Sequence, residues 1–147
     1  MLSTDDFSTD AYRPHGRVES RVMGRIFVQY AKGPFNEEII DAMRTVHENV
    51  LSELKCSGPW GAIFLIEENA MSSFPMLKQL TAYLSDQKNT GRASVGTAIV
   101  IGNTVEGGAM MAPLYVKAWI DAGIPCKLFK SLQEGSQWID DLLLQVH

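Results

Sequence analysis

The sequence predicts an α/β fold, a single-domain layered structure with a mostly parallel sheet of four or five strands, an antiparallel edge hairpin and four helices. Apolar segments of strand length alternate along the chain with segments of helical periodicity. Strands that alternate with helices are joined by crossovers, and crossovers build parallel sheets. A length of 147 residues suits one domain with its own core and is too short for two.

The N-terminal part predicts an arm and then a hairpin. Residues 1–15 are rich in Ser, Thr and Asp, so we expect a flexible arm there and one folded α/β domain over residues 16–147. Gly16–Glu19 and Arg25–Tyr30 are predicted strands around a turn at Met23-Gly24, because the second run has the alternation of a strand. This hairpin would form the antiparallel edge of the sheet.

The first helix is predicted from Asn36 to about residue 54. Gly33-Pro34 ends the preceding strand, and the Asn36 side chain can cap the helix by accepting a hydrogen bond from one of its unpaired amides. Two glutamates follow at the positive end of the helix dipole, and Phe35 can pack on Ile40 as a hydrophobic staple. Apolar residues at helical spacing predict one buried face: Ile39, Met43, Val46, Val50 and Leu54.

A second unit of strand and helix follows the break at Gly58-Pro59. Trp60–Ile66 is continuously apolar, which predicts a strand that is covered on both faces of the sheet. The Ser-Ser-Phe-Pro sequence at 72–75 then begins a helix that runs to about Ser85, since proline is well placed in a first turn. Asp86–Gly91 is predicted to be a polar loop.

The last two units repeat this order. Val95–Ile101 predicts another buried strand, and a helix over about 106–122 ends at a glycine, which commonly terminates helices. Pro125–Phe129 predicts a short strand. The final helix begins at a capping box, in which Ser131 and Glu134 each satisfy a main-chain amide of the other. Its predicted apolar face consists of Trp138, Ile139, Leu142, Leu143 and Val146.

Composition and charge narrow the functional classes. The net charge is −4, and lysines and arginines are scattered, so we expect no binding to nucleic acid or to an acidic membrane surface. No apolar run approaches the ~20 residues that span a bilayer, so no integral membrane segment is expected. The N-terminal residues are acidic and polar, unlike a secretory signal, which predicts a cytoplasmic protein.

The cysteines and histidines predict no metal site and no cofactor. Cys56 and Cys126 fit no metal-binding spacing. A disulfide between them stays open, although reduced thiols are the simpler interpretation. His15, His47 and His147 are not at ligand spacing, and no sequence motif places any of them in a catalytic triad.

Three segments resemble the STAS-like group of bacterial proteins: GPFNEE at 33–38, WGAIFLI at 60–66 and IPCKLFKSLQEGSQWIDDLL at 124–143. The resemblance covers about residues 16–146, in the order of the elements more than in identities. It implies the fold of anti-sigma-factor antagonists and of the cytoplasmic domain of sulfate transporters, in which helices pack against a four- or five-stranded sheet. It also implies a regulatory domain.

The resemblance points to a pair of serines as a candidate switch. In the antagonists, a serine at the start of the helix after the central strand is phosphorylated by a partner kinase, which switches binding. Ser72 and Ser73 stand in the corresponding place, but Met71 replaces the family's aspartate and Phe74 its glycine. Capping of the helix by one serine is the favoured interpretation, while a phosphate there would be electrostatically favourable. The candidate switch or binding residues are Ser72, Ser73, Glu67, Glu68 and Asn69.

Two candidate sites at strand ends also have simpler explanations. Glu67 and Glu68 lie where open α/β sheets place functional groups, but solvated loop carboxylates are the simpler interpretation. The loop GNTVEGG resembles a phosphate-binding loop, yet the Gly-Lys-Ser/Thr ending is missing and Glu106 would repel phosphate. Glycines that allow tight packing explain this loop better. The candidate anion-binding residues are Gly102, Asn103, Thr104, Gly107 and Gly108.

The third predicted helix carries more apolar residues than one buried face requires. Met110, Leu114 and Val116 point in different directions, which indicates a covered surface such as a dimer contact. We therefore expect a homo-oligomer.

The sequence thus predicts a non-enzymatic regulatory or binding module that acts through a protein partner or a small ligand, with serine phosphorylation as a candidate switch. Two alternatives stay open. STAS-like folds are similar to the lipid-binding domains of Sec14-type proteins, which implies a carrier of an apolar ligand. The GNTVEGG loop would instead serve an enzyme that acts on a phosphorylated metabolite.

Overall fold

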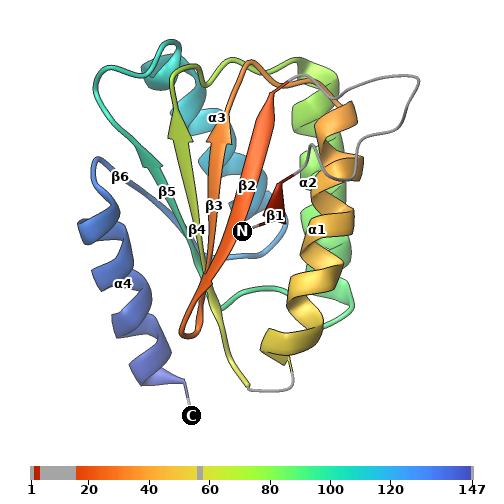
Figure 1. Cartoon of the computed structure of the whole chain (residues 1–147), viewed down its shortest axis with the longest axis vertical. Coiled ribbons are helices and arrows are strands. Elements are labelled where there is room, and N and C mark those ends of the chain that lie inside the picture. Colours follow the sequence, from red (N-terminus) through yellow and green to blue (C-terminus); the bar gives the residue numbers. More distant parts are fainter. Residues whose placement is uncertain (1, 4–15, 56–57, 147) are drawn as a thin grey trace.

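The computed structural model describes residues 2–3, 16–55 and 58–146 (Figure 1), and for residues 2–3 and 51–55 it describes the backbone alone. In this part of the chain there are six strands and four helices. They are β1 (Leu2–Ser3), β2 (Arg17–Met23), β3 (Ile26–Lys32), α1 (Glu38–Lys55), β4 (Gly61–Glu67), α2 (Phe74–Asn89), β5 (Thr97–Ile101), α3 (Gly108–Asp121), β6 (Cys126–Phe129) and α4 (Leu132–Gln145). The predicted α/β class, with its edge hairpin and four helices, is confirmed.

The strands lie side by side in the order in which they occur along the chain. β1, β2 and β3 pair antiparallel, and β3, β4, β5 and β6 pair parallel. The two-residue β1 extends the edge hairpin, because Leu2 is in register with Ser20 of β2. The predicted arm therefore begins with a short strand. The other residues of that arm lie outside the described part of the chain.

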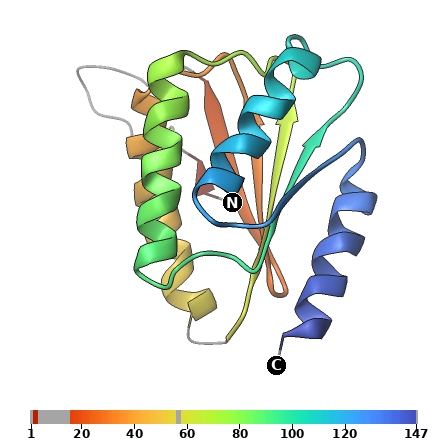
Figure 2. The same cartoon turned by 180° about the vertical axis from the view of Figure 1, so that it is seen from behind.

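This strand order decides which helices share a face. Crossovers between parallel strands are nearly always right-handed, so successive helices fall on one face when the strand order follows the chain. α1, α2 and α3 cover that face, and α4 covers the other (Figures 1 and 2). The alternation of β4 fits this arrangement, because Phe64 and Ile66 pack in the core beneath α1–α3 while Ile63 packs beneath α4.

Helix α4 lies close to the sheet because glycines face it. A Cβ atom at Gly61 of β4 would overlap the Ile139 side chain, and a Cβ at Gly135 of α4 would come within 3.1 Å of Val100. Ile139 is fully buried at this contact. Two glycines on opposite sides of the contact thus allow a close approach, which no larger residue would permit.

The predicted caps and staple of the helices are largely confirmed. Asn36 accepts a hydrogen bond from the Glu38 amide at 3.1 Å, and Phe35 and Ile40 are buried in the same core. The capping box of α4 is half correct. Ser131 accepts from the Glu134 amide at 3.3 Å, but the glutamate side chain accepts from the serine hydroxyl instead of from its amide.

Several predicted boundaries were wrong: β2 ends at Met23 and not at Glu19, and hydrogen bonding explains two others. α2 continues to Asn89, through the predicted loop Asp86–Gly91, because the Thr90 hydroxyl donates to the Asp86 carbonyl at 2.8 Å and so satisfies the helix end. α3 begins at Gly108 and not at Glu106, because both main-chain groups of Glu106 are bonded to the loop after β4.

Candidate functional site

Three loops meet at the carboxyl end of the parallel strands, where open α/β proteins place their ligands. The loop after β3 and the loop after β4 are joined by main-chain hydrogen bonds: Gly33 donates to Asn69 (2.8 Å), Phe35 donates to Met71 (2.8 Å), and Ser73 donates to Phe35 (3.1 Å). These bonds extend the parallel pairing beyond the ends of β3 and β4. The start of α2 is thereby fixed relative to the start of α1.

The loop after β5 is joined to the same structure. Ala70 donates to Glu106 at 2.8 Å, and Glu106 donates to Glu68 at 3.0 Å. Beneath them the buried Tyr115 hydroxyl of α3 donates to the Ala70 carbonyl at 2.6 Å. Burial raises the pKa of Tyr115, so this phenol stays protonated and remains a donor. We call the joined loops together with the first residue of α2, residues 33–36, 67–74 and 102–107, the carboxyl-end surface.

The strand order explains why these loops bond to one another and leave no opening between them. Ligand crevices in open α/β sheets form where the strand order reverses and neighbouring crossovers go to opposite faces. β3 to β6 follow each other without a reversal, so their loops turn the same way and bond to one another. Among the described residues, these loops therefore form a continuous surface. An open pocket of about 240 Å³ near the same end lies beside β2 and β3, where it is lined by Arg17, Glu19, Arg21, Tyr30, Lys32 and Glu67.

Both predicted serines lie on this surface, and one of them caps a helix as favoured. The Ser73 side chain accepts from the Met76 amide at 3.2 Å, which makes it the N-cap of α2. The Ser72 hydroxyl donates to the Ser73 carbonyl at 3.2 Å. Both serines are half-buried, and the next residue, Phe74, has 82% of its surface exposed. The first turn of α2 contains no acidic residue.

The predicted acidic residues lie beside the serines. Glu67 and Glu68 are exposed, and Glu68 forms an ion pair with Lys32 at 3.6 Å. Glu68 has a left-handed backbone conformation (φ 63°), which costs a residue other than glycine about 1–2 kcal/mol. Its main-chain bond to Glu106 holds it there. Asn69 turns inward, and its side chain accepts from the Met71 amide at 2.8 Å.

The predicted anion loop is brought against the serine loop, but its glycines also serve packing. Gly107 has a left-handed backbone (φ 71°), and a Cβ there would lie 2.5 Å from the sulfur of Met71. A Cβ at Gly108 would lie 2.8 Å from Ile101. Asn103 and Thr104 are exposed, whereas a Cβ at Gly102 would meet nothing within 4 Å. Binding of an anion by this loop stays a prediction.

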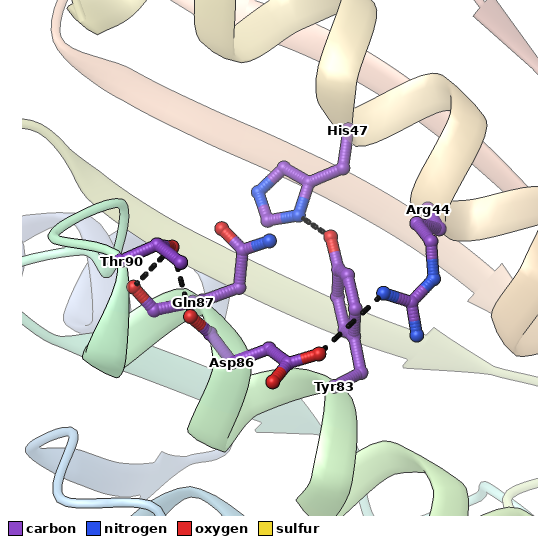
Figure 3. A network of polar contacts seen from close by, with 6 residues as sticks. All are labelled: Arg44, His47, Tyr83, Asp86, Gln87 and Thr90. Carbon is purple, nitrogen blue, oxygen red and sulfur yellow. Dashed lines mark hydrogen bonds and ion pairs between the residues drawn. The ribbon is translucent and has the colours of Figure 1, made fainter.

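A second site, at the opposite end of the sheet, was missed by the sequence analysis. His47 of α1 is buried, and its Nδ1 is hydrogen-bonded to the Tyr83 hydroxyl of α2 (Figure 3). Its ring stacks on Phe27 at 5.1 Å between centroids and meets Trp60 edge-on at 5.7 Å. Gln87 of α2 is also buried, with its amide turned toward the imidazole in Figure 3.

Burial controls the protonation of this pair. It lowers the pKa of His47 to about 3, so the imidazole is neutral. It raises the pKa of Tyr83, an effect that the nearby Arg44 partly opposes. Arg44 lies over the Tyr83 ring at 4.8 Å and forms an ion pair with Asp86 at 3.9 Å. A signal for His47 existed in the sequence, since it follows Met43 by four residues on the apolar face of α1.

The two sites are too far apart to share chemistry. Ser73 begins α2 and Tyr83 lies ten residues further along it, which is roughly 15 Å of helix. The histidine on Tyr83 therefore cannot act as a base for either serine, and the described residues bring no nucleophile–histidine pair together at the carboxyl end.

Metal ligands and thiols form no further site among the described residues. No group of three or more His, Cys, Asp or Glu that could hold a metal ion occurs in the described residues. Cys126 is a buried free thiol and is therefore not disulfide-bonded. Burial raises the pKa of this thiol to about 12. Cys56, His15 and His147 lie outside the described residues.

Among the described residues, no helix has the length and apolar character that crossing a membrane requires. No protein-family model matches the chain, and no curated protein sequence matches it.

Proposed function

We propose that this protein is a non-enzymatic regulatory binding module of STAS-like type, which docks a protein partner on its carboxyl-end surface. The observation that carries the proposal is the main-chain bonding among the three loops, because it gives the loops one fixed arrangement before any partner binds. A preformed surface loses little conformational entropy on association. A module that recognises a partner needs such a surface and does not need an enclosed active site.

The side chains on this surface define the partner's chemistry. Phe74 projects into solvent, and a large aromatic side chain of this kind is a typical anchor in protein interfaces. Exposed carboxylates surround the loops, at Glu67, Glu68 and Glu106. The partner is therefore a protein with an apolar pocket for the phenyl ring and basic side chains around it.

Phosphorylation of Ser72 or Ser73 is the proposed switch. A phosphate on either serine would sit beside the anchoring ring and add negative charge to an acidic surface. At Ser73 it would also lie at the N-terminus of α2, where helix amides favour an anion and no acidic side chain of the first turn competes. The modification would thus change the partner's affinity without unfolding the helix.

Native mass spectrometry of the protein purified from its own cells tests the proposal. We expect a co-purifying basic protein with the wild type and its loss with Phe74→Ser. Leu144→Ser is the matched control, because Leu144 is equally apolar and 71% exposed but lies on α4. Equal retention of the partner by the two variants would contradict docking at the carboxyl-end surface.

We also propose that the module is cytoplasmic and assembles with a second copy of itself through the outer face of α3. Met110 and Ile120 are 59% and 55% exposed on this helix, with Leu114 between them. Val116, expected with them, is half-buried against the core. The ion pair of Lys117 and Asp121 lies on the same face toward Ile120, so the apolar contact would centre on Met110 and Leu114, which favour burial against another apolar surface.

The two alternative functions remain predictions with less support. For a carrier of an apolar ligand, the cavity beneath α1 and α2 has a volume of about 30 Å³, which is enough for one or two water molecules. For an enzyme acting on a phosphorylated metabolite, the candidate anion loop lies next to three carboxylates, which would oppose phosphate binding.

A further inference from the structure

The cavity at the amino end of the sheet contains polar groups that the protein itself does not satisfy. Nε2 of His47 and Oε1 of Gln87 are fully buried, and neither has a hydrogen-bond partner among the described residues. Both side chains line the same cavity of about 30 Å³, whose other walls are mostly apolar and include the polar residues Gln29, Arg92, Ser94 and Thr97. An unsatisfied buried polar atom costs about 1–3 kcal/mol, so two of them facing one cavity indicate a place for a ligand.

The hydrogen bond to Tyr83 defines what this cavity can recognise. We assign the Tyr83 hydroxyl as the donor to Nδ1 of His47, because this tautomer gives the buried hydroxyl proton an acceptor. The ring proton of the neutral imidazole is then on Nε2, which becomes a donor to the cavity. Oε1 of Gln87 is an acceptor. The two unsatisfied atoms therefore offer one donor and one acceptor, and the charged side chain among the described lining residues is that of the exposed Arg92.

We propose that this cavity binds the hydroxyl group of a small neutral alcohol or phenol. A hydroxyl oxygen accepts from Nε2 of His47, while its proton is donated to Oε1 of Gln87. A carboxylate has no proton for the glutamine, and an ammonium group has no lone pair for the histidine. A primary amide could make both bonds, but it would bring a second N–H next to these two groups, and the described residues leave no further unsatisfied acceptor in the cavity.

The body of the ligand has a place next to the cavity. An open pocket of about 250 Å³ shares three lining residues with it, Trp60, Arg92 and Ala93. The main chain fixes this junction, since Val95 donates to the Trp60 carbonyl at 2.9 Å and Arg92 donates to the Gln87 carbonyl at 2.8 Å. An aromatic ring would lie against Trp60 there, with its hydroxyl directed inward. This site is independent of the carboxyl-end surface.

Thermal unfolding with phenol and with toluene tests the inference, because the two probes differ in the hydroxyl. We expect phenol to raise the melting temperature of the full chain and toluene at equal concentration to leave it unchanged. A ligand that binds only the folded state stabilises it by mass action. In NMR spectra the Nε2 proton of His47 should shift with phenol alone. Equal responses to both probes would overturn the proposal.

A glutamine substitution supplies the second test. Gln87→Met keeps the length of the side chain and removes the acceptor, so we expect the dissociation constant for phenol to rise at least about tenfold. Gln79→Met is the matched control, since Gln79 is exposed on the same helix. An unchanged phenol affinity in Gln87→Met would contradict the site. So would a crystal structure grown with phenol in which an ordered water alone joins His47 to Gln87.

Discussion

At the scale of single residues, His47 shows how burial overrides the ordinary properties of a side chain. An exposed histidine titrates near neutral pH, but desolvation lowers the pKa of His47 to about 3. Three nearby charged groups, Arg44, Arg92 and Glu48, also shift the pKa of Tyr83, but each has a smaller effect than burial. The folded protein therefore holds this imidazole neutral at pH values well above about 3.

This pKa predicts a pH dependence of stability. Because the folded pKa is lowered, the unfolded state binds the proton first as the pH falls. The contribution of neutral His47 to the free energy of unfolding is fully present above about pH 6.5. It is lost between there and about pH 3, at about 1.4 kcal/mol per pH unit. Urea unfolding at several pH values measures it. The double variant His47→Phe with Tyr83→Phe, which keeps the aromatic packing, should show a shallower slope; a slope equal to that of the wild type would contradict the assignment.

Residues whose role is local could be predicted from the sequence, and residues whose role depends on distant partners could not. Asn36 and Ser131 cap helices by bonding to amides two or three residues away. His47 and Gln87 become a site only because α1 and α2 bring them to one cavity. Gln87 in particular was assigned to a polar loop, since the cap that extends α2 past Ser85 depends on a threonine hydroxyl.

At the scale of elements, the two serines have different roles, because Ser73 is the N-cap of α2 and Ser72 is not. Ser73→Ala should lower the free energy of unfolding by about 1 kcal/mol, because the Met76 amide loses its acceptor. Ser73→Asp should keep the cap, since aspartate caps as well as serine does, and should change partner affinity instead. Ser72→Ala is the control in urea titrations, because the Ser72 hydroxyl caps no amide. A loss with Ser72→Ala as large as that with Ser73→Ala would show that capping is not the cause.

The joined loops predict a difference between two glycines of the carboxyl-end surface. A Cβ at Gly33 would overlap the main-chain oxygen of Asn69, whereas a Cβ at Gly102 would meet nothing within 4 Å. Gly33→Ala should therefore cost about 1–3 kcal/mol, and Gly102→Ala should change stability by less than about 0.5 kcal/mol. Thermal unfolding of both variants measures this. Similar melting temperatures would mean that the loops can separate without cost.

The bonding among the loops was beyond sequence analysis for a physical reason. Its donors and acceptors are main-chain groups, which every residue except proline carries in full, so no residue type marks them. The sequence placed the loops after β4 and β5 at strand ends correctly but gave no indication that Ala70 and Glu106 would pair. The glycine-rich composition of the second loop was informative, and tight packing at Gly107 and Gly108 agrees with the favoured interpretation.

At the scale of the whole molecule, the strand order determines where function can reside. Alternation of strands and helices predicted a parallel sheet, but many strand orders satisfy it, and only the sequential order removes the crevice at the carboxyl end. The same order places three helices on one face and leaves α4 alone on the other. No residue type in a buried apolar strand specifies which strand pairs with it, so this order could not be derived from the sequence.

The outer face of α3 predicts an oligomer. The double variant Met110→Glu with Leu114→Glu should convert a dimer into a monomer, because two carboxylates would be buried at the contact between copies. Size-exclusion chromatography with light scattering measures the mass. Leu144→Glu on α4 should remain dimeric. A wild-type protein that is monomeric at 100 µM or above (roughly the range in which weak interfaces associate) would contradict this proposal.

Zero-length carbodiimide cross-linking of the protein with its co-purified partner tests the central claim most directly, because it joins carboxylates to lysines that are already in contact. We expect cross-links from partner lysines to Glu67, Glu68 or Glu106 on the carboxyl-end surface. Cross-links confined to Asp140 and Asp141 on α4, or to Asp121 on α3, would contradict it.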